Sequence, residues 1–263
     1  MLPVLFHVGS FPIRSFGVAL IVGFVLALLM AKARAPRYGI EPSKVWDLAF
    51  GLLIFGVLGS RVLFILQELP YYLKHTNELF SPQFEGLTSF GGILAGFVVI
   101  VVWSRRHRVP IGAVLDMFAV PFLIAHAVGR IGCLLNGCCY GGPTDLPWGV
   151  HFHDVAGIRQ PAQIYDTLMT LAGAGLLLWI EKHRHLLLGQ SFSLMLVIYG
   201  ASRFIFEFWR AGSSSTYWGN LPITQAQAMA LLLVLAGSIA FALVGRRARA
   251  IESSATQVPT GIL

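Results

Sequence analysis

FAVPFLIAHAVGRIGCLLNGCCYGG, residues 118–142, joins an apolar run suited to a membrane helix to a loop rich in glycine and cysteine. In a helix, His126 and Arg130 lie four residues apart and therefore share one face. After Arg130 the apolar run breaks, and the glycines there allow the backbone to approach a ligand or a second helix closely. A cation at the edge of a membrane segment, beside such a loop, favours a phosphate-binding site.

The whole chain has the composition of an integral membrane protein. Its 263 residues are 56% hydrophobic and only 12% charged, and the mean hydropathy is +0.72. Because a helix needs about 20 mostly apolar residues to cross a bilayer, the sequence predicts an all-α, polytopic fold with seven transmembrane helices. These are expected over residues 15–31, 45–67, 87–103, 111–129, 163–180, 192–209 and 226–244. Residues 1–250 are expected to form one transmembrane domain, and residues 251–263 a disordered cytoplasmic tail.

The basic residues predict the orientation of these helices. Twelve of the 19 lysines and arginines fall in alternate loops and the C-terminal tail: Lys32, Arg34, Arg37, Lys44, Arg105, Arg106, Arg108, Lys182, Arg184, Arg246, Arg247 and Arg249. Short cytoplasmic loops retain such residues, so we expect the C-terminus in the cytoplasm and the N-terminus outside. Residues 130–161 then face the outer leaflet. No basic region precedes the first apolar segment, so we expect that helix to be retained and not cleaved as a signal peptide.

Polar residues within the sixth segment form one stripe. Tyr199, Arg203, Glu207 and Arg210 follow the spacing i, i+4, i+8, i+11, which places them on one helical face. We expect Arg203 about two turns inside this helix and Arg130 at the end of its own. One interpretation is a structural ion pair between Arg203 and Glu207, with Arg210 reaching to the interface. The other is an anion site, because two arginines share one acid and leave positive charge for a phosphate.

Other kinds of chemistry have weaker support. The spacings of Cys133, Cys138 and Cys139 match no common zinc motif, so we expect no metal and no cofactor, and interpret the cysteines as packed loop residues. The sequence lacks nucleophile-elbow, Walker and dinucleotide-binding motifs. Its basic residues form no patch, so no nucleic acid is expected as a partner. His126 is interpreted as a packed helix residue. Asp166 belongs to a polar cluster at the outer end of the fifth segment.

The residues Gly129, Arg130, Ile131, Gly132, Asn136, Gly137 and Gly141 resemble the signature of the prolipoprotein diacylglyceryl transferases of bacterial inner membranes. The resemblance extends from about residue 6 to residue 244 in the family's order. It includes the run Arg14, Ser15, Phe16, Gly17 and the paired glycines Gly91 and Gly92. It also includes Pro161, Gln163 and Tyr165, and then Tyr199, Gly200, Arg203, Glu207, Phe208 and Arg210.

This resemblance implies an enzyme that moves the diacylglyceryl group of phosphatidylglycerol onto the lipobox cysteine of a prolipoprotein and releases glycerol phosphate. The reaction is expected at the outer leaflet of the inner membrane, with the substrate's own thiolate as nucleophile. Arg130, Arg203 and Glu207 are expected to carry catalysis. Substrate binding is assigned to Arg130, Asn136, Gly141, Gln163, Tyr165, Tyr199, Arg203 and Arg210.

Several positions depart from the family pattern. Phe16 and Phe90 stand where the family usually has a tyrosine and a histidine, and Cys133, Cys138 and Gln160 replace an asparagine, a glutamate and a histidine. These changes remove polar groups, among them the group that the resemblance implies as acceptor of the thiol proton, but they keep the arginines. A second interpretation therefore stays open, in which the chain is a non-catalytic phospholipid-binding or lipid-moving paralogue.

Overall fold

The protein is described by a computed structural model covering residues 1–9, 11–76, 88–153, 155–210 and 223–256. The chain folds into two compact units. The first unit combines residues 1–30 with residues 115–263, and the second contains residues 31–114. The first unit holds all the residues to which the sequence assigns catalysis or substrate binding.

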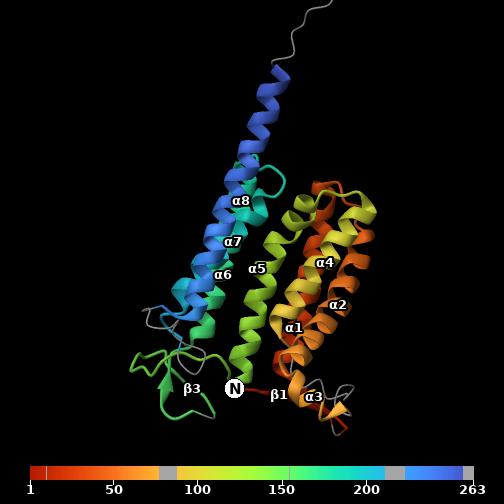
Figure 1. Ribbon diagram of the computed structural model, residues 1–263. Coiled ribbons are helices and arrows are strands. Elements are labelled where there is room, and N and C mark those ends of the chain that lie inside the picture. The colour runs from red at the N-terminus through yellow and green to blue at the C-terminus, as the bar shows by residue number, and fades with distance from the viewer. Residues whose placement is uncertain (10, 77–87, 154, 211–222, 257–263) are drawn as a thin grey trace, which may run out of the picture. The chain divides into compact units, whose positions relative to one another are not determined.

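Helices make up most of the described chain, which confirms the all-helical prediction (Figure 1). The α-helices are α1 (Ser15–Arg34), α2 (Lys44–Gln67), α3 (Leu69–Tyr72), α4 (Ser89–His107), α5 (Ile111–Asn136), α6 (Ala162–His183), α7 (Gln190–Phe206) and α8 (Gln225–Thr256). A 3₁₀ turn, η1, covers Ala35–Tyr38. Two short antiparallel hairpins, which the sequence did not predict, pair β1 (Val4–Val8) with β2 (Phe11–Arg14) and β3 (Val150–His151) with β4 (Ile158–Arg159).

The core of the first unit lies where α5, α6 and α7 meet. It contains Ala119, Val120, Leu123, Ala174, Leu177 and Met195. Helix α7 also lies beside α8, as Figure 1 shows. Glycines allow this approach, since a Cβ atom on Gly200 would lie 2.8 Å from the carbonyl oxygen of Ala230. Small residues at helix contacts are the usual means of close packing in membranes, and here they fix the position of the helix that carries Arg203.

Helix α5 is longer than the sequence predicted. We expected it to end at residue 129, but it continues to Asn136, and Gly137 ends it with a φ of +78°. The glycine at position 132 does not break the helix because it packs against α1, where a Cβ would lie 2.5 Å from the Cβ of Ala19. The prediction was wrong because a glycine needed for helix packing has the same sequence signature as a helix breaker.

The second unit is organised around α2 and α4, which pack along a line of glycines. A Cβ on Gly59 would lie 2.7 Å from the carbonyl oxygen of Gly91, and one on Gly92 would lie 2.6 Å from the Oγ of Ser60. The paired glycines Gly91 and Gly92 therefore let two membrane helices approach closely. At one end of this pair, the guanidinium of Arg61 lies 5.5 Å from the ring centroid of Tyr72, which partly shields its charge.

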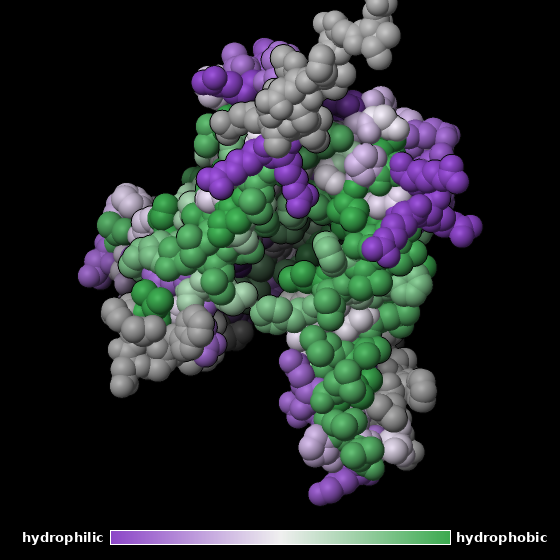
Figure 2. All heavy atoms as spheres, turned by 45° about the horizontal axis from the view of Figure 1, so that its top comes forward, coloured by the Kyte–Doolittle hydropathy of each residue, from purple (hydrophilic) through white to green (hydrophobic). Residues whose placement is uncertain are grey.

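The described helices have the length and surface of membrane spans. Six of the helices that the structure describes are long and apolar enough to cross a bilayer, and α7 is a shorter apolar helix. Large hydrophobic side chains cover their outer faces: Ile21 is 65% exposed, Ile93 69% and Ile239 58%. Figure 2 shows hydrophobic side chains along the helices and hydrophilic ones gathered toward their ends. Such surfaces suit lipid, so the chain is a multi-pass membrane protein.

Two other boundaries differ from the predicted ones. Helix α7 ends at Phe206, so Arg203 lies in its last turn, not two turns inside, and Glu207 is the C-cap residue. At the other end of the chain, α8 continues to Thr256, past residue 251, where we placed the start of the tail. Residues 257–263, the rest of that tail, lie outside the described residues, as do residues 77–87 of the predicted loop between the second and third spans.

Candidate functional site

Arg130 forms a buried ion pair with an acid on a neighbouring helix. Its Nε atom lies 2.5 Å from Oδ2 of Asp166 in α6, and the two side chains are 13% and 2% exposed. His126, one turn earlier in α5, places its Nε2 atom 3.4 Å from the same oxygen. Thr170 donates a hydrogen bond of 3.4 Å to the other carboxylate oxygen. Asp166 therefore fixes the position of Arg130, because a buried charge needs both a partner and hydrogen bonds.

Arg203 forms a second ion pair of the same kind. Its Nη1 atom lies 2.6 Å from Oε2 of Glu207, and Nη1 of Arg210 lies 3.8 Å from that oxygen. Glu207 is only 4% exposed, and Thr224 donates a 3.1 Å hydrogen bond to its Oε1 atom. The structure therefore brings Arg203, Glu207 and Arg210 together, although Glu207 and Arg210 lie beyond the end of α7. Arg210 turns inward to the shared carboxylate, which differs from the first interpretation, in which it reaches to the interface.

One aromatic ring brings the two ion pairs together. The centroid of the Phe206 ring lies 5.1 Å from the guanidinium carbon of Arg130 and 5.1 Å from that of Arg203. Phe206 is fully buried, so both arginines make cation–π contacts with a ring that water does not reach. Tyr199 completes this group, with its ring centroid 5.1 Å from that of His126.

The group carries more positive than negative side chains. Arg130, Arg203 and Arg210 supply three positive charges against the two negative charges of Asp166 and Glu207. One donor atom, Nε of Arg210, is buried and has no hydrogen-bond partner among the described residues, whereas Nη1 of Arg203 already contacts Glu207. Because buried donors are nearly always paired in proteins, the Arg210 atom and the net positive charge of the group suit an anionic ligand.

The loop after α5 connects this group to the end of α7. The amide of Gly141 donates a 2.9 Å hydrogen bond to the carbonyl of Gln160, and the amide of Gly142 donates one of 3.1 Å to the carbonyl of Trp209. A Cβ on Gly141 would lie 2.7 Å from that Trp209 oxygen. Gly141, which the sequence assigned to substrate binding, is therefore placed where it holds two chain segments together beside Arg210.

The other predicted binding residues lie at different distances from the arginines' ion pairs. Gln163 is fully buried, donates a 2.6 Å hydrogen bond to the carbonyl of Cys138, and leaves its Oε1 atom without a partner among the described residues. The hydroxyl of Tyr165 accepts a 2.7 Å hydrogen bond from Trp148, so it contacts a loop residue. Asn136 is the half-buried last residue of α5. The Tyr165 ring also lies 5.6 Å from that of Trp209, the residue before Arg210.

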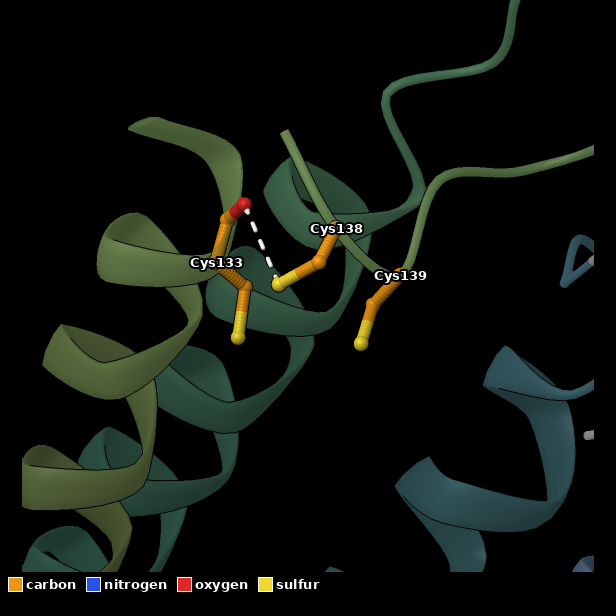
Figure 3. Close-up of side chains that lie close together, drawn as sticks. All are labelled: Cys133, Cys138 and Cys139. Carbon is orange, nitrogen blue, oxygen red and sulfur yellow. Dashed lines mark hydrogen bonds between the residues drawn. The ribbon is translucent and has the colours of Figure 1, made fainter. Parts of the chain in front are cut away.

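The three cysteines form a cluster that their spacing did not predict. Their Sγ atoms all lie within 4.8 Å of one another, and Cys138 donates a 3.6 Å hydrogen bond to the carbonyl of Cys133 (Figure 3). Figure 3 shows Cys133 on the end of α5 and the other two on the loop that folds back beside it. The extension of α5 causes this arrangement, since it places Cys133 on the last helical turn.

The surroundings of Cys139 favour the deprotonated form of its thiol. A hydrogen bond from Cys133, together with the charges of Arg130 and Arg210, lowers the pKa of Cys139 to about 5, although burial opposes the change. Cys139 also adopts a φ of +62°, which is uncommon for a residue other than glycine. The cysteine cluster is therefore electrically coupled to the arginine group.

Three residues of the arginine group had no assigned role in the sequence. Asp166 had a signal, because an acid within an apolar run needs a partner, but the sequence did not identify Arg130 as that partner. Nothing in the sequence indicates a role for Phe206, an ordinary apolar residue of the sixth segment, or for Thr224, which precedes the last segment. His126 contacts Tyr199 and Asp166, so it packs within the group, as the sequence led us to expect.

Known proteins match this chain over almost its full length. A family model described as prolipoprotein diacylglyceryl transferase matches residues 3–243. A phosphatidylglycerol–prolipoprotein diacylglyceryl transferase of Geobacter sulfurreducens is 30% identical over 93% of this chain and 96% of its own length. Proteins of the same name from Polynucleobacter asymbioticus and Clostridium tetani are 31% and 29% identical, covering 89% and 92% of this chain and 93% and 97% of theirs. The chain therefore belongs to the prolipoprotein diacylglyceryl transferase family.

Proposed function

We propose that this protein transfers the diacylglyceryl group of phosphatidylglycerol to the lipobox cysteine of a prolipoprotein. Two findings support the proposal: membership of a transferase family whose similar members carry this activity in their names, and a buried group of three arginines and two acids inside a membrane protein. The observation that carries it is the placement of Arg130 and Arg203 around one buried ring, near a buried Arg210 donor that has no hydrogen-bond partner among the described residues.

The arginines suit the phosphodiester of the donor lipid. A planar guanidinium binds two phosphate oxygens at once. Its attraction to the phosphate is stronger in a site from which water is excluded. Arg130 and Arg203 would hold the phosphate from two sides, and Arg210 would add a third donor. Asp166 and Glu207 contact the arginines, so we assign them positioning roles: Glu207 would take part in catalysis by orienting Arg203.

The reaction would proceed by displacement at carbon. The acceptor thiolate attacks the glyceryl carbon attached to the phosphate oxygen, a carbon–sulfur bond forms, and the carbon–oxygen bond breaks. The electron pair stays on the phosphate oxygen, and glycerol phosphate leaves. Negative charge on the phosphate grows during this step, and the fixed guanidinium groups of Arg130 and Arg203 stabilise it without having to reorganise.

The remaining predicted binding residues would shape the entrance to the site. Gln163 offers a buried carbonyl oxygen, unpaired among the described residues, to a donor group of the substrate such as a glycerol hydroxyl. Tyr199 lies beside His126, while Gly141 and Tyr165 hold the loop between α5 and α6, and Asn136 begins that loop. We further propose that α7 completes seven spans, with the N-terminus outside, the C-terminus in the cytoplasm, and the site open to the outer leaflet of the bacterial inner membrane.

Arginine variants test this proposal. Replacing Arg203 by alanine should weaken phosphatidylglycerol binding and abolish transfer, and Arg203→Lys should also impair transfer because lysine keeps the charge but loses the two-pronged geometry. Arg130→Ala should behave in the same way. Arg184→Ala, at an exposed position after α6, is the matched control. Normal lipid binding and turnover in Arg203→Ala, with reduced stability in detergent, would show that the ion pair is only structural.

A non-catalytic lipid-binding protein is the second candidate. It is favoured by the finding that Arg130 and Arg203 each already contact a carboxylate, as structural ion pairs do. This candidate predicts that the purified protein binds phosphatidylglycerol, that Arg203→Ala reduces the binding, and that no glycerol phosphate is released when a lipobox peptide is added.

A further inference from the structure

We propose that Cys133, Cys138 and Cys139 bind one Zn²⁺ ion through their sulfur atoms, and that the ion's open position holds the acceptor thiol as a thiolate. The metal site itself was not predicted by the cysteine spacing alone. The role in activating the acceptor thiol rests on the proposed transfer function, since that thiol is the group the reaction modifies.

The geometry of the cluster suits a tetrahedral ion. Zinc–sulfur bonds of about 2.3 Å place neighbouring sulfur atoms about 3.8 Å apart around the ion. The Sγ atoms of Cys133, Cys138 and Cys139 already lie within 4.8 Å of one another. Zinc would therefore bind after small side-chain rotations, without movement of α5. Thiolate sulfur is also a ligand type that zinc prefers.

Burial of the cluster is uneven, which leaves one side open. Cys133 is 8% exposed at the end of α5, whereas Cys138 and Cys139 are only half-buried on the loop. Three protein ligands with one open coordination position are typical of zinc sites that act on a substrate, and four protein ligands are typical of structural sites. No fourth cysteine, histidine or acid completes this cluster among the described residues.

Charge also favours an ion at this place. Three neighbouring thiolates would carry a charge of −3, and Zn²⁺ reduces it to −1. Arg130 lies one turn before Cys133 in α5, and its positive charge would stabilise that remaining negative charge. The same spacing places the cluster near an arginine that would hold the phosphate, so a thiol bound to the ion would lie near a bound donor lipid.

The ion would keep the acceptor cysteine in its reactive thiolate form. A cysteine thiol with a pKa of about 8.5 is mostly protonated at neutral pH, and only the thiolate is nucleophilic. Coordination to zinc releases the thiol proton to solvent and keeps the sulfur as a bound thiolate. A sulfur electron pair then attacks the glyceryl carbon, the carbon–oxygen bond breaks toward the phosphate, and the neutral thioether product leaves the ion.

Metal content gives the first test. Reduced protein without a histidine tag, equilibrated with Zn²⁺ and desalted, should retain about one zinc per chain. The triple variant Cys133→Ser, Cys138→Ser, Cys139→Ser should retain almost none, while His151→Gln, a potential ligand outside the cluster, should retain the wild-type amount. Absence of bound zinc from the folded wild-type protein, or equal zinc in the triple variant, would overturn the proposal.

Cobalt tests the open position. Co²⁺ bound in place of zinc should show sulfur-to-metal absorption, and a lipobox peptide should shift its visible bands by adding a fourth sulfur ligand. The same peptide with serine in place of its cysteine should not. A spectrum that the cysteine peptide leaves unchanged would overturn the role in thiol activation, because the acceptor would then not reach the ion.

Turnover separates this inference from the proposed function. If both hold, chelator treatment should reduce transfer on the order of 100-fold, as expected when a group that deprotonates the nucleophile is lost, and Zn²⁺ should restore it. Full transfer by the zinc-free protein or the triple variant would overturn the zinc site and leave the transferase function standing. Zinc and peptide binding without any product from phosphatidylglycerol would overturn the transferase function instead.

Discussion

The arginines at the centre of this protein are each held by one carboxylate and share one ring. Arg130 contacts Asp166 at 2.5 Å, Arg203 contacts Glu207 at 2.6 Å, and Phe206 lies between both guanidinium groups. Pairing lowers the cost of placing arginine inside a membrane protein, and it also fixes the direction in which the remaining N–H groups point. Preorganised donors are the feature that phosphate recognition requires.

Asp166→Asn tests whether that acid positions Arg130. The amide keeps the shape of the side chain but removes its charge, and breaking a buried ion pair from one side costs about 3–5 kcal/mol. We expect a lower melting temperature in detergent and a loss of transfer, with the protein still inserted in the membrane. Asp145→Asn, at an exposed loop position, should leave both unchanged. Wild-type stability and turnover in Asp166→Asn would contradict the positioning role.

At this scale the sequence predicted local contacts and missed distant ones. Arg203, Glu207 and Arg210 were placed together because helical spacing determines which side chains share a face. The contact between Arg130 and Asp166 joins two helices, and the cysteine cluster depends on the path of a loop. Neither follows from spacing, since both depend on how α5 and α6 pack and on where α5 ends.

Among the helices, glycine determines how closely α7 approaches its neighbours. A Cβ on Gly200 would meet the Ala230 carbonyl at 2.8 Å and a Val234 side-chain carbon at 2.9 Å. Both atoms belong to α8, and the first is backbone, which cannot rotate away. The arginine on α7 therefore keeps its place only while this contact between α7 and α8 is intact.

A pair of alanine substitutions tests that contact. Gly200→Ala should lower stability by about 1–3 kcal/mol, the usual cost of overpacking, and should reduce transfer by shifting Arg203. Gly175→Ala, inside α6 with nothing within 4 Å of the added Cβ, should be neutral or slightly stabilising because alanine favours helix over glycine. Thermal unfolding in detergent measures both. Equal melting temperatures for the two variants would show that α7 and α8 can separate at no cost.

Hydropathy predicted which segments are helical, but it predicted the residues at which the helices end less accurately. Each of the seven apolar segments corresponds to a helix, because long apolar runs have no other stable form in a bilayer. The end of α5 was missed since Gly132 packs against Ala19, a reason that lies in another helix. The hairpins were missed because β3 and β4 have only two residues each, too few to show an alternating pattern.

The whole molecule has the composition and helix lengths of a multi-pass membrane protein, and its basic residues predict how it is oriented. The bias of 12 of 19 lysines and arginines toward one set of loops is independent of family membership. Orientation determines the compartment from which the arginine group and the cysteine cluster are reached, so it decides whether a secreted acceptor can meet the site.

Reporter fusions test the orientation. A reporter that is active only in the cytoplasm should be active when it is attached after Val244. A reporter that is active only outside the cytoplasm should be active when it is inserted near Asn77, which lies outside the described residues. A third fusion within residues 105–108, a basic cluster between two apolar segments, should report the cytoplasm and serves as the internal control. The opposite pattern would place the site on the cytoplasmic face and contradict the proposed acceptor.

The central claim, transfer of diacylglyceryl from phosphatidylglycerol to a cysteine thiol, is tested most directly by one assay. Purified protein is incubated with phosphatidylglycerol labelled in its acyl chains and with a lipobox peptide, and the peptide is analysed by mass spectrometry. We predict a thioether-linked diacylglyceryl peptide from the wild-type protein and none from Arg203→Ala that is folded and inserted. No labelled peptide from the wild-type protein, or equal product from Arg203→Ala, would contradict the account.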